Sequence, residues 1–218
     1  MFSHLKYFFI LVLFLPLIGC DLEVQKPFEF VPETNDIATY ENQTVWEWLQ
    51  TQKSPSSLTA VDQYKFDFLI DAIEYTGLVE EFNRKSDRRT FLLLNNNAFD
   101  DANKILQTLT GKVTGPVRAA DKVRLANLLK YHIIDKEYIT QIDPLKAYGS
   151  DYFFQTLNEG DNGKILLRRD ERYTVSVNPA TVFPLTATRR GTTVRTHNLR
   201  YANGIAHVLN DYTRNVAF

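Results

Sequence analysis

The spacing of apolar residues along the chain changes where its last third begins, and this change limits the fold classes that the chain can adopt. From Thr44 to Ile134, except in a short strand-like run at Thr90–Leu94, apolar residues recur mainly every three or four positions, as they do along one side of an amphipathic helix. From Tyr152 onward, apolar and polar residues alternate in short runs, as they do in half-buried strands. Helical segments followed by strands predict a domain of the α+β class.

Capping residues and turn dipeptides predict where these elements begin and end. The predicted helices are one after Thr44, with Glu47 completing a capping box, one through Phe66–Ile73 with a stop at Gly77, one from Asn95 with an apolar side reaching Leu109, and one from Asp121 to near Ile134. The predicted strands are Thr90–Leu94, Tyr152–Leu157, Lys164–Arg169, Tyr173–Val177, Thr192–Thr196 and Ile205–Leu209, with turns at Asn162-Gly163 and Asn203-Gly204.

The first nineteen residues have the make-up of a secretory signal. A short head that contains Lys6 precedes a nearly unbroken apolar run from Tyr7 to Ile18. The run is shorter than the roughly 20 apolar residues that a membrane-spanning helix needs. We therefore expect residues 1–19 to be removed as a signal peptide.

Cys20 gives this signal a specific end. The segment Leu17-Ile18-Gly19-Cys20 resembles the lipobox of bacterial lipoproteins. This resemblance implies diacylglyceryl transfer to the Cys20 thiol, cleavage before Cys20, and acylation of the new amino group with a fatty acid such as palmitate. Cys20 is the only cysteine of the chain, so it forms no internal disulfide. Two or three acyl chains hold a protein stably on a membrane surface, and the sequence predicts such an anchor here.

Residues 20–43 are predicted to form a lipidated tether. The segment contains Pro27, Pro32 and many polar residues without a sustained period. Asp21 and Glu23 resemble the surface-export signals of some Bacteroidetes lipoproteins. We expect an outer-membrane location in the cell envelope, and the sequence leaves open which face of the membrane carries the protein.

Composition fits one folded domain after this tether. Hydrophobic residues make up 44% of the 218 residues and aromatic residues 13%, which is enough for a substantial core. Loss of Lys6 with the signal leaves 24 of the 25 basic residues against 26 acidic ones. This balance offers no general attraction to nucleic acid, so nucleic acid is not an expected partner.

Three segments, taken in order, resemble the fasciclin (FAS1) domain family. They are Thr90–Phe99, similar to the family's first motif T-V-F-A-P-T-N-E-A-F, Leu128–Ile134, similar to its central L-L-x-Y-H-hydrophobic segment, and Asn203–Leu209, similar to its closing N-G-hydrophobic-x-H-V-hydrophobic strand. The resemblance covers residues 44–218 and implies a single FAS1 β-wedge or sandwich with flanking helices. The residues that it marks as structural are Asn95, His132, Asn203, Gly204 and His207.

The chain also departs from the family pattern. Leu94 stands where the family usually has proline, and Asn95 where it has threonine. Asparagine is an equally good N-cap, so we expect the helix start to persist. The segment Pro179–Gly191, which includes Arg189 and Arg190, is an extra excursion between late strands and is the first candidate for a recognition loop.

The motifs of common enzymes are absent from the sequence. It contains no G-x-S-x-G, HExxH, EF-hand loop or phosphate-binding glycine run. The mature histidines, His132, His197 and His207, lack the close spacing of common zinc motifs. We therefore expect no catalysis, no cofactor and no bound metal.

Tyr131 and His132 carry the sharpest functional implication of the resemblance. In animal FAS1 proteins the Tyr-His segment has been linked to integrin-type adhesion. Helical geometry places His132 between Leu128 and Leu129 in angle, on the apolar side, so we expect its ring to face the core and meet a buried polar partner. Tyr131, about 100° away around the helix, is expected to be partly exposed and is a candidate binding residue. His207, inside a strand, is expected to be a core histidine.

Aromatic and basic residues supply the remaining binding candidates. Trp46 and Trp48 are separated by about 200° on the predicted helix, so one is expected in the core. The other, taken as Trp48, is a candidate stacking surface for sugars. Arg189 and Arg190 belong to a basic group that includes Arg168, Arg169, Arg172 and Arg195. This group is either a solvated face or a contact surface for acidic glycans or a protein.

These features predict a lipid-anchored envelope protein whose FAS1 domain binds a protein or glycan, as a binding or cell adhesion module. The membrane, reached through the lipid at Cys20, is a further partner. The alternative is an accessory subunit of an outer-membrane nutrient or polysaccharide uptake system. A hydrolase with an unrecognised site is a third class, and a deep cleft with converging titratable groups would favour it.

Overall fold

The computed structural model describes residues 38–55, 62–85, 88–179 and 189–218. The predicted α+β class is confirmed, with helices mainly before the strands. The helices are α2 (Val45–Gln50), α3 (Asp67–Thr76), α4 (Val79–Asn83), α5 (Ile105–Thr110) and α6 (Lys122–Tyr131), with 3-10 turns η2 (Asn96–Ala98), η3 (Val117–Ala119) and η4 (Asp161–Gly163). The strands are β1 (Ala38–Tyr40), β2 (Arg89–Leu94), β3 (Ile133–Ile134), β4 (Tyr152–Gln155), β5 (Lys164–Arg169), β6 (Val175–Val177), β7 (Thr192–Tyr201) and β8 (Gly204–Leu209).

The described strands form one sheet in which β2 and β8, far apart in the sequence, are neighbours. Its order is β3-β2-β8-β7-β6-β5-β4, and β1 pairs with β7 outside this path. The pairs β2–β8 and β1–β7 are parallel. The other pairs are antiparallel. Parallel pairing of β2 with β8 therefore holds the first and last thirds of the domain together.

The two ends of this strand path meet. Ile134, at the end of β3, forms an antiparallel bridge with Thr156, directly after β4. The Asp135 amide donates to the Gln155 carbonyl at 3.0 Å, and the Leu157 amide donates to the Ile133 carbonyl at 3.0 Å. These bonds cover part of the edge of each terminal strand and give the sheet a barrel-like closure.

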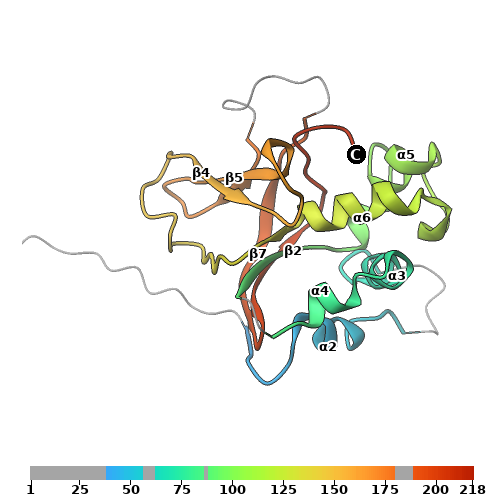
Figure 1. The fold of residues 1–218 in the computed structure, drawn as a ribbon, viewed down its shortest axis with the longest axis horizontal. Coiled ribbons are helices and arrows are strands. Elements are labelled where there is room, and N and C mark those ends of the chain that lie inside the picture. The colour runs from blue at the N-terminus through green and yellow to red at the C-terminus, as the bar shows by residue number, and fades with distance from the viewer. Residues whose placement is uncertain (1–37, 56–61, 86–87, 180–188) are drawn as a thin grey trace, which may run out of the picture. The chain divides into compact units, whose positions relative to one another are not determined.

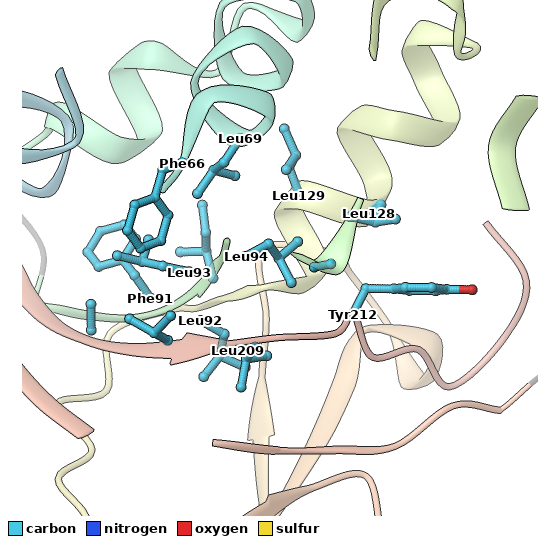
Figure 2. Close-up of a cluster of buried hydrophobic side chains, with 14 of the residues drawn as sticks. Phe66, Leu69, Phe91, Leu92, Leu93, Leu94, Leu128, Leu129, Leu209 and Tyr212 are labelled. Carbon is cyan, nitrogen blue, oxygen red and sulfur yellow. The ribbon is translucent and has the colours of Figure 1, made fainter. Parts of the chain in front are cut away.

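The parallel pair β2–β8 lies in the core. Every residue of both strands is buried, which is expected for a parallel pair that is covered on both faces. Figure 2 shows the side chains that meet there: Leu92, Leu93 and Leu94 from β2, Leu209 from β8, Leu128 and Leu129 from α6, and Phe66 and Leu69 at the start of α3.

The helices gather on one side of the strands in Figure 1, and β4 and β5 lie on the other side. Helix α3 packs against α6 and η3, and α2 packs against α4. Each of these helices is short, so its stability comes mainly from burying its apolar side rather than from helix propensity. Among the described helices, none has both the length and the apolar character that crossing a membrane requires.

Local signals for the first two helices are confirmed. The Thr44 hydroxyl accepts a hydrogen bond from the Glu47 amide at 3.2 Å, and the Glu47 carboxylate accepts one from the Thr44 amide at 2.7 Å. This is the predicted capping box at the start of α2. Helix α3 ends at Gly77, whose φ of 79° is the left-handed conformation that glycine adopts without steric strain.

The helix predicted from Asn95 to Leu109 is wrong, because that segment divides into η2 and α5. The amides of Asn96 and Asn97 donate to the carbonyls of Lys65 and Gln63, at 2.8 and 3.1 Å. The buried Asn96 side chain also accepts from the Phe68 amide at 3.0 Å. These tertiary bonds fix the first turn, and Asn103, with a φ of 63°, interrupts the chain before α5 begins.

The predicted end of the fourth helix is also wrong. Asp121 caps α6 as expected, its carboxylate accepting from the Arg124 amide at 2.9 Å. However, α6 ends at Tyr131, and β3 pairs with β2, with Ile133 opposite Phe91. The β-branched residues Ile133 and Ile134 thus extend the sheet instead of the helix.

Two other segments differ from the predicted layout. Strand β1 lies within the range predicted as tether, so Ala38–Tyr40 pairs with the sheet through β7. Strand β7 runs for ten residues instead of ending at Thr196, with register shifts between Val194 and Leu199. Residues 180–188 of the predicted excursion, and all of residues 1–37, lie outside the described part of the chain.

Candidate functional site

Tyr131 is a core residue, so the predicted partial exposure of its side chain is wrong. It is 1% exposed. Its hydroxyl donates to the Lys164 carbonyl at 2.8 Å and accepts from the Asn178 side-chain amide at 2.9 Å. Burial raises the pKa of Tyr131 to about 12. The side chain therefore joins the end of α6 to β5 and to the end of β6, and it is not presented on the surface.

The predicted burial of His132 is confirmed, and both nitrogens of its ring have partners. Nδ1 lies 2.8 Å from the Leu128 carbonyl, so Nδ1 carries the proton and donates it. Nε2 accepts a hydrogen bond from the Thr213 amide at 3.1 Å. Burial lowers the pKa of His132 to about 4. A neutral His132 thus ties the end of α6 to the segment after β8.

His207 is satisfied in the same way, with the opposite tautomer. Its Nε2 donates to the Ile139 carbonyl at 2.8 Å, and its Nδ1 accepts from the Asn198 amide at 3.3 Å. Burial lowers the pKa of His207 to about 4. His197 lies beside it, with 5.7 Å between ring centroids. Within the described part of the chain, no group of three histidine or acidic side chains is arranged to hold a metal ion.

Asn203 and Gly204 form the tight turn between β7 and β8 and brace two helices. The Asn203 side chain accepts from the Val45 amide at 2.9 Å and donates to the Phe82 carbonyl at 2.8 Å. A Cβ on Gly204 would lie 2.2 Å from the Arg89 carbonyl oxygen. The motif that resembles the family's closing strand therefore joins α2, α4 and β2 at one corner.

Asn95 has a structural role, but it does not cap a helix as expected. It makes no side-chain cap to the turn that follows. Instead, its side-chain amide donates to the Asn210 side-chain oxygen at 2.7 Å, and its backbone amide donates to the Leu209 carbonyl at 3.2 Å. Asn95 therefore continues the pairing of β2 with β8 beyond the last strand residues.

Trp48 is not available as a stacking surface. Its side chain is 7% exposed and is surrounded by the rings of Tyr40, Phe66 and Tyr201, with centroids 5.4 to 5.6 Å away. Its counterpart Trp46 is partly buried against the same core. The expectation that one tryptophan lies in the core is correct, but the assignment of Trp48 to the surface is wrong.

Arg189 and Arg190 bond to their own domain. The Arg189 guanidinium donates to the Asn178 carbonyl at 2.8 Å and also to the Pro179 carbonyl. Arg190 forms an ion pair with Asp211 at 2.5 Å, and its guanidinium lies 4.6 Å from the Tyr212 ring centroid. These contacts close the base of the excursion, while its middle, residues 180–188, lies outside the described residues.

A cavity of about 410 Å³ opens beside Tyr131, which lines it, whereas the other predicted binding candidates, Trp48, Arg189 and Arg190, do not. Its walls come from the second half of α6, the loop that follows β4, and the segment after β8. Its polar lining residues are Asn127, Lys130, Asn158, Glu159, Asn162 and Asn215. Sequence reasoning missed this site, because its residues are of types that commonly face solvent. The one signal that could have indicated it is the group of asparagines in the turn near Asn162.

The cavity has an apolar part next to this polar rim. Phe218 and Leu157 are partly buried against the core and line it together with Val216. The Phe218 ring packs edge-on against Tyr131, with 5.9 Å between ring centroids. The arrangement provides hydrogen-bond donors, acceptors and an aromatic side chain, which are the groups that recognise a ligand.

A helix-flanked sheet of this topology, with buried, hydrogen-bonded histidines at its core, defines the architectural class of the domain. The sequence profile described as Fasciclin domain matches residues 64–212. The chain belongs to the fasciclin domain family.

The fold has also been seen in a FAS1 domain pair from the insect cell adhesion molecule fasciclin I. The two are similar with a TM-score of 0.54 and 14% sequence identity over 79% of this chain. The match takes in 51% of the fasciclin I chain, so this protein spans about half the length of that structure. No curated protein shows a significant sequence match.

Proposed function

We propose that the protein is a lipid-anchored binding or adhesion module of the cell envelope. The observation that carries the proposal is the position of a fasciclin domain, matched over residues 64–212, downstream of a lipobox-like segment that ends at Cys20. The domain supplies recognition and the lipid supplies its location. The similarity in fold to part of a cell adhesion molecule supports the same assignment.

The chemistry of the described residues supports binding rather than catalysis. The buried histidines His132 and His207 have both ring nitrogens engaged by backbone groups, so neither is free to act as a general base. The described cavity beside Tyr131 holds amides, one lysine and one glutamate, without an adjacent nucleophile and base.

The anchor is tested by changing Cys20 to serine. Serine removes the thiol that would accept diacylglycerol, so we expect loss of fatty-acid labelling and transfer of the protein from the membrane to the soluble fraction, or retention of the uncleaved precursor. The measurement is metabolic labelling with radioactive palmitate, followed by membrane fractionation. Equal labelling of the Cys20→Ser variant and the unchanged protein would rule out this anchor.

The recognition half of the proposal is tested by capture from cross-linked envelopes with the intact lipoprotein as bait. A glycan or several surface proteins recovered with the bait would agree with an adhesion module. Recovery of one stoichiometric membrane protein would instead assign the chain as an accessory subunit of an uptake system. Repeating the capture with residues 179–191 deleted determines whether the excursion takes part.

A further inference from the structure

We propose that the cavity beside Tyr131 is a binding site for a neutral sugar residue of a glycan. The inference rests on the proposed binding function and assigns to it a place and a ligand class. The site is formed by Asn127 and Lys130 of α6, Asn158, Glu159 and Asn162 of the loop after β4, and Phe218.

The size of the cavity suits one or two sugar rings. Its volume of about 410 Å³ lies in the lower part of the roughly 300–1,000 Å³ range of small-molecule sites. The cavity is open to solvent, so a glycan could continue beyond the residue that is held. A concave site of this size favours a compact ligand over the broad, flat contact typical of folded protein partners.

The lining matches the two faces of a pyranose ring. Hydroxyl groups around the ring edge both donate and accept, and the side-chain amides of Asn127, Asn158 and Asn162 can do the same. The C–H face of a sugar is apolar, and the partly buried Phe218 ring offers it a matching surface. Purely apolar ligands would leave the amides without partners, at a cost in binding free energy.

The charges of the lining favour a neutral sugar over an acidic one. Lys130 and Glu159 both line the cavity and carry opposite charges, so they contribute no net attraction for an anion. Each can form a charge-assisted hydrogen bond to a hydroxyl group, Lys130 as donor and Glu159 as acceptor. The basic residues expected to attract acidic glycans, Arg189 and Arg190, do not line this cavity.

The walls are held in place before any ligand arrives. The Asn158 side chain donates to the Asn127 carbonyl at 2.9 Å, which ties the loop to α6. The Thr156 hydroxyl donates to the Gly163 carbonyl at 2.7 Å and closes the base of the loop. A Cβ on Gly163 would lie 1.8 Å from the Asn158 carbonyl oxygen, so the loop packs closely on itself. A preformed site loses less conformational entropy when it binds.

The test uses the mature lipoprotein in detergent and an array of immobilised neutral disaccharides, namely lactose, maltose, chitobiose and mannobiose, with a hyaluronan disaccharide as the acidic comparison. The test variant combines Asn127→Ala with Glu159→Gln. Both side chains are exposed, and alanine favours a helix, so the fold is expected to persist. The matched control combines Lys112→Gln with Glu137→Gln, two exposed residues outside the cavity lining.

We expect at least one neutral disaccharide to bind, with affinity reduced about tenfold or more in the Asn127→Ala/Glu159→Gln variant and unchanged in the control, at equal thermal stability. Titration of the best free disaccharide should shift the NMR signals of the side-chain amides of Asn158 and Asn162. Absence of neutral-sugar binding, equal binding by the cavity variant, or preference for the acidic disaccharide would each overturn the assignment.

The same variants separate failure of this inference from failure of the proposed function. If the cavity variant still captures the envelope ligand of the unchanged protein, the binding function holds and the sugar site is wrong. If the unchanged protein captures neither a sugar nor an envelope component, both are wrong.

Discussion

At the scale of single residues, the buried histidines show how the family's motif residues act through hydrogen bonds. His132 is protonated on Nδ1 and His207 on Nε2, and in each ring the other nitrogen accepts from a backbone amide. A second proton on either ring would face an amide N–H with no acceptor. The fold therefore requires the neutral form of both rings.

This requirement predicts an acid-sensitive fold. In the unfolded chain a histidine takes up a proton as the pH falls through its pKa of about 6.5. In the folded protein His132 and His207 stay neutral until about pH 4. The unfolded state thus binds more protons between these values, so stability is full above about pH 6.5 and is lost as the pH falls toward 4.

The expected loss is about 3.5 kcal/mol per histidine at most, because the pKa lies at about 4 instead of 6.5 and each pKa unit corresponds to about 1.4 kcal/mol. Urea unfolding at pH 7.5 and pH 4.5 measures it. His132→Gln, which cannot titrate, should be less stable at pH 7.5 and should show a smaller fall between the two pH values than the unchanged protein. An equal fall in both proteins would mean that His132 is not the group responsible.

Tyr131 provides a second prediction at this scale. Tyr131→Phe keeps the ring but leaves the Lys164 carbonyl and the Asn178 amide without their hydroxyl partner. The free energy of unfolding should fall by about 1–3 kcal/mol, as for other buried polar groups left unsatisfied. Chemical denaturation measures this change, with Tyr148→Phe, at an exposed tyrosine, as the matched control. Equal stability of both variants would contradict the bonded position of Tyr131.

At the scale of elements, the tight turn between β7 and β8 leaves little space for a side chain at Gly204. Gly204 lies where the hairpin meets β2. We expect Gly204→Ala to destabilise the domain by roughly 3 kcal/mol, because its Cβ would overlap the Arg89 carbonyl oxygen and force the backbone to shift.

Gly149→Ala is the matched control for this change. Gly149 has a φ of 71° but no atom within 4 Å of the added Cβ, so only backbone strain of about 1–2 kcal/mol is expected. Thermal unfolding of the two variants compares them. Similar midpoints for both would show that the close approach at Gly204 is relieved at little cost.

Local signals predicted some elements correctly and tertiary contacts decided the others. The capping box at Thr44 and the stop at Gly77 depend on neighbours within a few residues, so the sequence was sufficient there. The turn at Asn96 depends on bonds to residues near Lys65, which no periodicity reveals. Tyr131 was expected near the surface because its angle on a helix was considered without the strands that cover it.

The candidate site was harder to predict than the fold. Asn127 and Asn158 are 31 positions apart, and their contact depends on how α6 lies against the loop after β4. The motif residues recognised in the sequence, His132 and His207, have structural positions instead. The family motifs therefore indicated residues that stabilise the fold, whereas the open cavity is lined by residue types that are common on any protein surface.

At the scale of the whole molecule, stability is expected to be uneven across the sheet. The strands β2 and β8 are fully buried and each pairs with a strand on both sides, whereas among the described residues β4 pairs along its length with β5 alone. Hydrogen exchange should therefore be slowest at the amides of β2 and β8 and faster at those of β4. Mass spectrometry of peptides from the exchanged protein measures this order. Faster exchange in β8 than in β4 would contradict it.

The parallel pairing of β2 with β8 also governs the order of events during synthesis. A ribosome produces the chain from its N-terminus, so the residues of β2 are synthesised long before those of β8, its parallel partner. Gly204–Leu209 must be made before the β2–β8 pair can form. Until then the hydrophobic strand Arg89–Leu94 has an unpaired edge, so we expect the nascent chain to need protection by a chaperone until its last strand is available.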